Sequence, residues 1–256
     1  MSYNVHLQTN ASYKSIKYGQ GTVYSSGCGP ASLCNALDAL GIASITVAAM
    51  CSYAVSVGAR VSGGTDMHKL LQAASKKYGF SYRETSKNAE LLSHLQRGGA
   101  AIVHAGDSYP LFSTGGHFLA AVAADGQQIT LLDSYWYSGK YTASTMRRRN
   151  ITVVKKGVIR TDVTQCGKAT ADRSPSYYLI TKNADKKMQP DEAAKKEDDD
   201  MLYYKNIADV PTYYRASIQK LIDKGFLQGT GKGEINVSED FCRIATINDR
   251  AGLYGD

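Results

Sequence analysis

The sequence lacks any hydrophobic run long enough to cross a membrane. None of its 256 residues belongs to an uninterrupted apolar stretch approaching about 18 residues, the length typical of a transmembrane helix. The first residues, Met1 to His6, also lack the charged segment and apolar run of a secretory signal. We therefore expect no transmembrane segment, and a protein that works in the cytoplasm or leaves the cell by lysis or by non-classical export.

Cysteine is scarce and irregularly spaced, which argues against a disulfide framework and against a metal site. The five cysteines stand at positions 28, 34, 51, 166 and 242. An odd number cannot be fully paired, and no Cys-x-x-Cys motif or Cys/His cluster has the spacing of zinc ligands. We expect reduced thiols, no bound metal and no cofactor.

Acidic residues are scarce in the first part of the chain. Residues 1–181 carry 18 Lys and Arg against 9 Asp and Glu, whereas residues 202–256 carry 7 of each, within a net charge of +7. Basic clusters at 147–149 and 155–156, together with 18 tyrosines, would suit nucleic acid or an anionic polymer. A solvated basic surface is the commoner explanation, so we expect no nucleic-acid partner.

Apolar residues are almost absent from residues 182–201, where charges of both signs surround a single proline. A segment with this composition has too few apolar side chains to form a buried core. We therefore predict that it is a charged linker. The linker separates a main domain, 1–181, from a small module, 202–256. In the module, Pro211 and Ser238 each begin a predicted helix. We therefore expect a small α-helical unit with a thin core.

The main domain presents helical patterns first and strand patterns second. The patterns predict an extended lead-in over 1–27 and a loop at 60–64. They predict four helices: about 30–40, part of 44–59, from a Thr65 cap to Gly79, and from an Asn88 cap to Gly98. They predict strands at 100–105, 117–123, 129–134, 156–163 and 176–181. Helices followed by strands are typical of an α+β fold. We expect N-terminal helices packed on an antiparallel sheet.

One cysteine, Cys28, lies where a turn opens into a helix. Gly27 and Gly29 flank it and let the backbone bend tightly, and a proline follows in the first helical turn. A thiol at a helix N-terminus meets the positive end of the helix dipole, which stabilises the thiolate. Cys28 is therefore a candidate nucleophile. A cysteine is more often a small buried hydrophobe, as we expect of Cys34 and Cys51.

A histidine and an aspartate come together in a predicted hairpin. His117 follows Gly115-Gly116 and begins a strand, Asp125-Gly126 is a strong turn signal, and the chain returns through Asp133. With that turn, positions that sum to about 250 lie opposite each other, so His117 and Asp133 face each other within hydrogen-bond reach. We interpret them as a general base and the residue that orients it, against the alternative of a strand-end histidine and a turn residue. The other histidines, at positions 6, 68, 94 and 104, fit a polar lead-in, two helix patterns and an apolar strand.

These blocks of sequence resemble a known family. Ser26-Gly27-Cys28-Gly29-Pro30-Ala31-Ser32 is similar to the active-site segment of papain-like cysteine peptidases of the bacteriocin-leader-processing, or double-glycine, type, and most similar to their stand-alone bacterial relatives. The spacing before the cysteine is matched by Gln8, Tyr13 and Tyr18-Gly19, and the histidine and aspartate blocks by Gly115-Gly116-His117-Phe118 and Leu132-Asp133. The resemblance covers roughly residues 1–181. It departs from the family where Tyr13 replaces a common tryptophan and Asn10 a common aspartate.

The resemblance implies a papain-like fold with Cys28 as the nucleophile, His117 as the base and Asp133 as the residue that orients the base. It also implies that the side chain of Gln8 and the backbone N–H of Cys28 bind the oxyanion. Gln20, which is nearer to Cys28 in sequence, is the alternative side-chain donor.

The C-terminal module carries a resemblance of its own. The segments Asp209-Val210-Pro211, Ile218 to Gly229 and Leu253-Tyr254-Gly255 are similar to surface-layer-homology-type helical modules, especially the short tails of cell-wall hydrolases and phage lysins. This resemblance implies tethering to a cell-wall polymer or another partner.

Together these features predict a thiol-dependent hydrolase that cleaves peptide or amide bonds through an acyl-enzyme on Cys28. The expected substrate is a peptide or a peptidoglycan stem peptide, and the lack of a leader fits an endolysin-like protein of a bacterium or phage. The alternatives are a non-catalytic surface-binding protein that retains the fold, and a transpeptidase that uses the same three residues.

Overall fold

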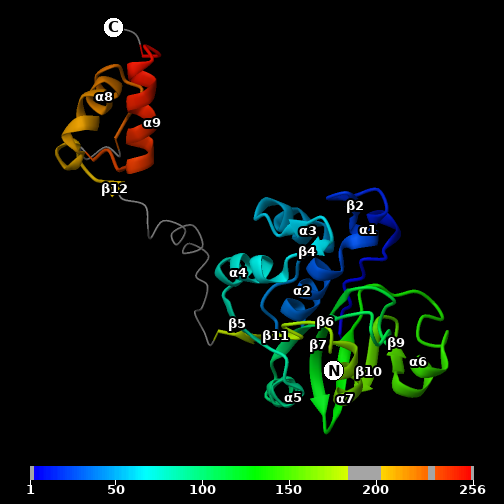
Figure 1. Cartoon of the computed structure of the whole chain (residues 1–256). Coiled ribbons are helices and arrows are strands. Elements are labelled where there is room, and N and C mark those ends of the chain that lie inside the picture. Colours follow the sequence, from blue (N-terminus) through cyan, green and yellow to red (C-terminus); the bar gives the residue numbers. More distant parts are fainter. Residues whose placement is uncertain (1–2, 184–202, 230–233, 255–256) are drawn as a thin grey trace. The chain divides into compact units, whose positions relative to one another are not determined.

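The structure is a computed structural model that describes residues 3–183, 203–229 and 234–254 (Figure 1). The chain forms two compact units, residues 1–185 and 186–256. The expected linker, 182–201, lies outside the described residues except for its first two, and Lys182 is the last residue of a strand. The linker and its limits therefore stay a prediction.

The first unit is built on a seven-stranded antiparallel sheet. In spatial order the strands are β5 (Phe80–Thr85), β11 (Tyr177–Lys182), β6 (Ala100–Ala105), β7 (His117–Asp125), β8 (Gln128–Leu132), β10 (Val158–Asp162) and β9 (Thr152–Lys155). Each neighbouring pair runs antiparallel. The inner strand β6 is buried along nearly all its length, because helices cover both faces of the sheet.

Helices lie on the two faces of this sheet (Figure 1). On one face lie α2 (Cys28–Ala39), α3 (Val47–Ser56) and α4 (Met67–Tyr78), and on the other α5 (Asn88–Gln96) and α7 (Val163–Ala169). Alternate strand residues serve the two cores: Ile102 packs in the core with α2, and Val103 in the core with α5. The expected α+β class, with N-terminal helices on an antiparallel sheet, is confirmed.

Several short elements differ from the expectations. The lead-in is not simply extended, because it contains a 3₁₀ turn at Ala11–Tyr13, the strands β1 (Lys17–Tyr18) and β2 (Gly21–Thr22), and the helix α1 (Val23–Ser26). The loop at 60–64 is a hairpin of β3 (Arg60–Val61) and β4 (Gly64–Thr65), and α6 (Thr145–Asn150), α7 and β5 were not expected. Apart from β5, which is as long as β6, these elements are too short for a hydrophobic period to reveal them.

Two helix caps also differ. Thr65 belongs to β4, and its hydroxyl lies 2.7 Å from the Tyr18 hydroxyl, so the cap of α4 is Asp66. Asn88 is the first residue of α5 and not its cap, and its Oδ1 accepts a hydrogen bond from the Tyr177 hydroxyl at 2.6 Å. In both cases the side chain that was expected to cap the helix contacts a distant tyrosine instead.

The second unit is small and mainly helical, as expected. Its helices are α8 (Thr212–Asp223), which follows Pro211, and α9 (Glu239–Arg250), which follows a Ser238 cap. A two-stranded ladder of β12 (Tyr203–Tyr204) and β13 (Val237–Ser238), with a 3₁₀ turn at Ile207–Asp209, was not expected. The core is a small cluster of side chains from both helices and this ladder.

Within the described ranges, no helix combines the length and the apolar character that spanning a membrane requires. The same ranges hold no group of three or more histidine, cysteine or acidic side chains arranged to bind a metal ion.

Candidate active site

Cys28 is the first residue of α2, at its junction with α1. Thr22 and Ser25 form a capping box that starts α1, and Gly27 alone separates the end of α1 from Cys28. Among the five cysteines, all of them free, Cys28 is the one that is partly exposed. The predicted position at a helix N-terminus is confirmed. A thiol there is both accessible and close to the positive end of the helix dipole.

The glycines beside Cys28 are required by close packing and not by an unusual backbone conformation. Gly27 has a φ of −84°, and Gly29 is not among the glycines with positive φ. A Cβ on Gly27 would lie 2.5 Å from the carbonyl oxygen of Val23, and one on Gly29 would lie 2.8 Å from the Cβ of Thr65. The interpretation that they permit a tight bend is therefore corrected: they allow neighbouring segments to approach the backbone around the thiol.

The substitution Gly27→Ala is expected to destabilise the fold by about 1–3 kcal/mol, because the added carbon meets a backbone oxygen of α1 that cannot rotate away. Chemical denaturation followed by circular dichroism measures the change. Gly63→Ala is the matched control, since an added carbon there has open space around it. Equal stability of the two variants would contradict the close packing at Gly27.

His117 and Asp133 meet at one end of the β7–β8 hairpin. His117 Nε2 lies 2.8 Å from Asp133 Oδ1, and both side chains are buried. The register differs from the expected one, because Ala120 pairs with Leu132 and a bulge follows Ala121. Asp133 lies just past the last residue of β8, so the two side chains meet diagonally and not directly opposite each other. Diagonal neighbours are still within reach of long side chains.

The side chain of Cys28 lies close enough to that of His117 for each to shift the pKa of the other. Because Nε2 of the imidazole faces Asp133, the nitrogen that remains for the thiol is Nδ1. The ring of Tyr135 packs edge-on against the imidazole, with 6.2 Å between the centroids. The structure thus brings together Cys28, His117 and Asp133, from the helical half of the unit and from the sheet.

The electrostatics favour an ion pair between thiol and imidazole. Burial raises the pKa of Cys28, but the hydrogen bond and charge of His117, with backbone hydrogen bonds from Phe118 and Gly29, outweigh burial and lower this pKa. Burial lowers the pKa of His117, but its hydrogen bonds to Asp133 and Cys28 outweigh burial and raise that pKa. Both shifts favour a thiolate beside an imidazolium, which is an activated nucleophile.

Asp133 receives four hydrogen bonds in the interior. Oδ1 accepts from His117 and, at 3.1 Å, from the backbone N–H of Tyr135. Oδ2 accepts from Lys140 Nζ and from the Tyr141 hydroxyl, each at 2.6 Å. Burial raises the pKa of Asp133, but the bond to His117 and the charge of Lys140 outweigh it and lower the pKa to about 2. Asp133 is therefore ionised and fixes the orientation of the imidazole.

Sequence reasoning missed Lys140 and Tyr141. Both follow β8 in a segment, Ser138-Gly139-Lys140-Tyr141, that has the composition of an exposed turn. Instead, the Lys140 side chain is 2% exposed and also donates to the carbonyl of Tyr135 at 2.9 Å. No local sequence pattern predicts that this lysine is buried, because the ion pair with Asp133 offsets the cost of burying its charge.

Gln8 lies between the cysteine and aspartate segments. Its Nε2 donates to the carbonyl of Tyr24 in α1 at 3.0 Å, and its Oε1 accepts from the hydroxyl of Ser134 at 2.9 Å. The side chain is buried, whereas Gln20 is exposed in the β1–β2 turn. Of the two candidate oxyanion donors, Gln8 is the one that the fold holds among the buried residues next to Asp133.

The other candidate side chains lie elsewhere. His6 Nε2 meets Asp38 at 2.7 Å, His68 Nδ1 meets Glu84 at 2.7 Å, and His94 Nε2 meets the carbonyls of Ala100 and Ile180 at 3.1 and 2.9 Å. His104 stacks on Phe118, and burial lowers its pKa to about 4, so it is neutral at pH 7. Cys34 and Cys51 are buried, as expected.

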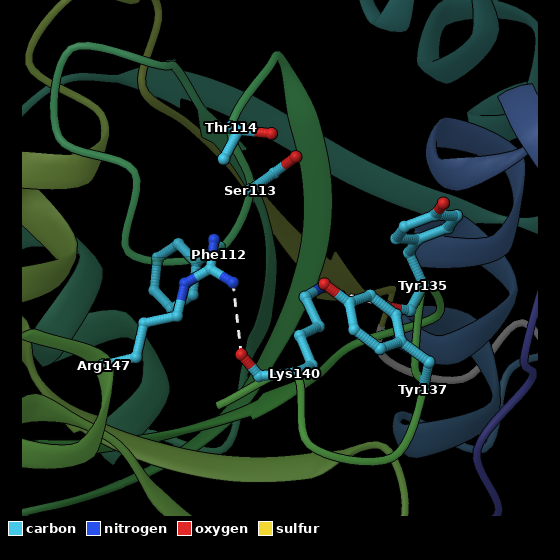
Figure 2. Close-up of a pocket in the computed structure, with 7 residues that line it drawn as sticks. All are labelled: Phe112, Ser113, Thr114, Tyr135, Tyr137, Lys140 and Arg147. Atoms are coloured by element: carbon cyan, nitrogen blue, oxygen red, sulfur yellow. Dashed lines mark hydrogen bonds between the residues drawn. The ribbon is translucent and has the colours of Figure 1, made fainter. Parts of the chain in front are cut away.

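A cavity of about 260 Å³ borders this group of residues (Figure 2). Its lining residues are Phe112, Ser113, Thr114, Tyr135, Tyr137, Lys140 and Arg147. Tyr135 and Lys140 also bind Asp133, and Thr114 is followed directly by Gly115-Gly116-His117. The cavity therefore lies beside the imidazole and carboxylate.

The thiol and the imidazole come from two different layers of the fold. A helix that starts at a thiol packs on an antiparallel sheet that carries the imidazole, as expected from the sequence. Neither a family model nor a curated protein sequence matches this chain.

Two solved structures similar to this chain carry peptidase descriptions. One is a C39-like peptidase from Bacillus anthracis, with a TM-score of 0.43 and 13% identity, covering 63% of this chain and 91% of that one. The other is the peptidase domain of Streptococcus ComA, a bi-functional ABC transporter of a quorum-sensing pathway, with a TM-score of 0.40 and 17% identity, covering 61% of this chain and 90% of that one.

Proposed function

We propose that this protein is a cysteine peptidase that cleaves peptide or amide bonds through an acyl-enzyme on Cys28. One observation carries the proposal. A partly exposed thiol at a helix N-terminus lies beside His117, which lowers the pKa of the thiol, and Nε2 of His117 meets Asp133 at 2.8 Å. Nucleophilic catalysis by a thiol needs this combination of a lowered pKa, a base and a residue that orients the base.

In the first half of the reaction, the Cys28 thiolate attacks the carbonyl carbon of the scissile bond. His117, which is protonated in the resting ion pair, gives its proton to the leaving amine as the C–N bond breaks. In the second half, neutral His117 takes a proton from water, and the resulting hydroxide attacks the acyl carbon and displaces the thiolate. Asp133 holds the ring in one orientation through both halves.

Two N–H groups are available for the oxyanion that forms in each half. The amide nitrogen of Gln8 carries two N–H groups, of which the bond to Tyr24 uses one. The N–H of Cys28 lies in the first turn of α2, where a helix offers no internal acceptor. Each fixed donor of this kind contributes roughly 10²–10³-fold to the rate of acyl transfer.

For the substrate, we propose bacterial cell-wall peptides, with the second unit as a tether to the wall or to a wall-associated partner. The sequence resemblance of that unit to wall-associated modules supports this assignment. Exposed apolar side chains on the unit, among them Tyr213, Phe226 and Leu253, provide a surface for such contacts. Release by lysis would bring the protein to its substrate.

Iodoacetamide is expected to alkylate Cys28 ahead of the four other cysteines at neutral pH. Its pKa is lowered and its side chain is partly exposed, whereas burial raises the pKa of Cys34, Cys51, Cys166 and Cys242. Peptide mapping by mass spectrometry locates the label. In a Cys28→Ser variant the fast phase of labelling should vanish. Uniform labelling of all five thiols, or none at Cys28, would overturn the proposal.

Two further assays separate the alternatives. Release of peptides from casein measures proteolysis, and clearing of a Gram-positive cell-wall suspension measures wall lysis. A transpeptidase would instead incorporate an added amine, such as a glycine peptide, into its product. A non-catalytic binding protein would bind walls and give none of these products.

A further inference from the structure

The charged side chains that line the cavity beside His117 and Asp133 are all positive. The cavity is lined by two cations, Lys140 and Arg147, by the hydroxyl-bearing side chains of Ser113, Thr114, Tyr135 and Tyr137, and by no acidic side chain. Both cations are almost fully buried, with 2% of Lys140 and 7% of Arg147 exposed. Their charges are therefore only weakly screened by solvent.

The charge of Lys140 is already balanced, and that of Arg147 is not. Lys140 forms an ion pair with Asp133 at 2.6 Å. Arg147 bonds only to neutral backbone carbonyls: Nε and one terminal nitrogen donate to Pro110, and the other terminal nitrogen donates to Lys140 at 3.1 Å. Among the described residues, no carboxylate pairs with Arg147.

These bonds also leave donors free. A guanidinium has five N–H groups, and the three bonds of Arg147 use three of them. The bonds to Pro110 and Lys140 hold the planar group still, with its head directed into the cavity (Figure 2). A fixed guanidinium with spare donors is suited to bind a carboxylate.

We propose that this cavity is a substrate subsite that binds a carboxylate of the peptide through Arg147, with Ser113, Thr114 and the two tyrosines as further polar partners. The inference rests on the proposed peptidase function and names its specificity: a peptide that bears a carboxylate near the scissile bond. That carboxylate is either an acidic side chain or the free C-terminus of the peptide. The alternative is that Arg147 only joins two loops, which would give no preference for acidic ligands.

Binding is tested in full-length protein carrying Cys28→Ala, so that the result does not depend on turnover. The probes are two matched pairs: N-acetyl-glutamate α-amide against N-acetyl-glutamine α-amide, and N-acetyl-alanine against its amide. The readout is the nuclear magnetic resonance signal of Arg147 Nε–H and of the Ser113 and Thr114 amides. In at least one pair, the acid is expected to bind roughly 10-fold or more tightly than its amide, because charge-assisted hydrogen bonds are the stronger ones. The pair that responds identifies the source of the carboxylate.

Variants decide whether Arg147 and its cavity cause the preference. Arg147→Met should abolish it, whereas Arg149→Met, which removes the same charge from an exposed neighbour on α6, should leave it intact. If Arg147→Met does not fold, the exposed Thr114 supplies a second test. Thr114→Glu adds a competing carboxylate to the cavity lining and should abolish binding of the acid probes. Thr114→Gln, its matched control, should retain that binding. Equal binding of acid and amide in both pairs, or a preference that survives Thr114→Glu, would overturn the assignment. If the protein binds the acid probes but shows no catalysis, the proposed peptidase function is refuted and the carboxylate subsite is not.

Discussion

Replacing His117 with alanine is expected to lower peptidase activity by on the order of 10⁴-fold or more. The variant keeps the Cys28 thiol but loses the group that gives a proton to the leaving amine and later takes one from water. It also loses the hydrogen bond and the charge that lower the pKa of Cys28. The kcat/KM for a peptide substrate, measured at equal enzyme concentration, gives the size of the effect.

The same variant is expected to shift the pH dependence of Cys28 alkylation upward. Alkylation requires the thiolate, so its rate rises as the pH passes through the pKa of the thiol. In the wild-type protein that pKa lies below the ordinary value for a cysteine, because His117 outweighs the effect of burial. Without His117, burial is the largest remaining influence, and the pKa moves above that ordinary value.

His68→Ala is the matched control for both measurements. His68 is an exposed histidine that pairs with Glu84 and takes no part in the site, so activity and alkylation profile should be unchanged. If His117→Ala left the alkylation profile in place, the pKa of Cys28 would be set by the helix terminus alone. His117 would then have no role in activating the thiol.

The meeting of Cys28, His117 and Asp133 could be predicted because each residue has a local signal in the sequence. Cys28 starts an apolar helical repeat, and His117 follows a pair of glycines at the start of a strand. Asp133 could be paired with His117 although the expected register of the hairpin was offset. The pairing survives the error because a side chain at the end of a strand reaches diagonal as well as opposite neighbours.

The residues around these three side chains could not be predicted, because their positions depend on partners far away in sequence. Arg147 is one of three consecutive arginines, and the sequence alone assigned all three to a solvated surface. The structure buries it against Pro110 and Lys140, and leaves its two neighbours exposed. Which arginine of such a run is buried depends on how α6 packs, and a six-residue helix has too few residues to show an apolar face.

The edge strand β5 illustrates a second limit. Its residues are mostly exposed or half-buried and show no clean alternation of apolar and polar side chains. Pairing with β11 along its whole length holds it in the sheet. Backbone hydrogen bonds of this kind do not depend on side-chain type, so they leave little trace in the sequence.

Replacing Lys140 with methionine is expected to destabilise the first unit by about 3–5 kcal/mol, the usual cost of leaving one partner of a buried ion pair without the other. Methionine fills similar space but removes the ammonium group that lies 2.6 Å from Asp133 Oδ2. Asp133 would keep its bonds to His117 and Tyr141 but would carry a less compensated charge in the interior. Urea denaturation at pH 7 measures the loss, and Lys156→Met, at an exposed lysine, should change stability by no more than about 0.5 kcal/mol.

The pH dependence of stability tests whether Asp133 is the cause of that loss. Its folded pKa of about 2 lies below the ordinary value of about 3.9, so its contribution to stability is present above pH 4 and is lost as the pH falls toward 2. In Lys140→Met the folded pKa of Asp133 rises, because burial still raises it and the charge of Lys140 no longer lowers it. The two proteins should therefore differ most near pH 7 and converge in acid, where Asp133 is protonated in both. A stability difference that stayed constant down to pH 3 would assign the loss to packing of the lysine stem, and not to the ion pair that holds Asp133 ionised beside His117.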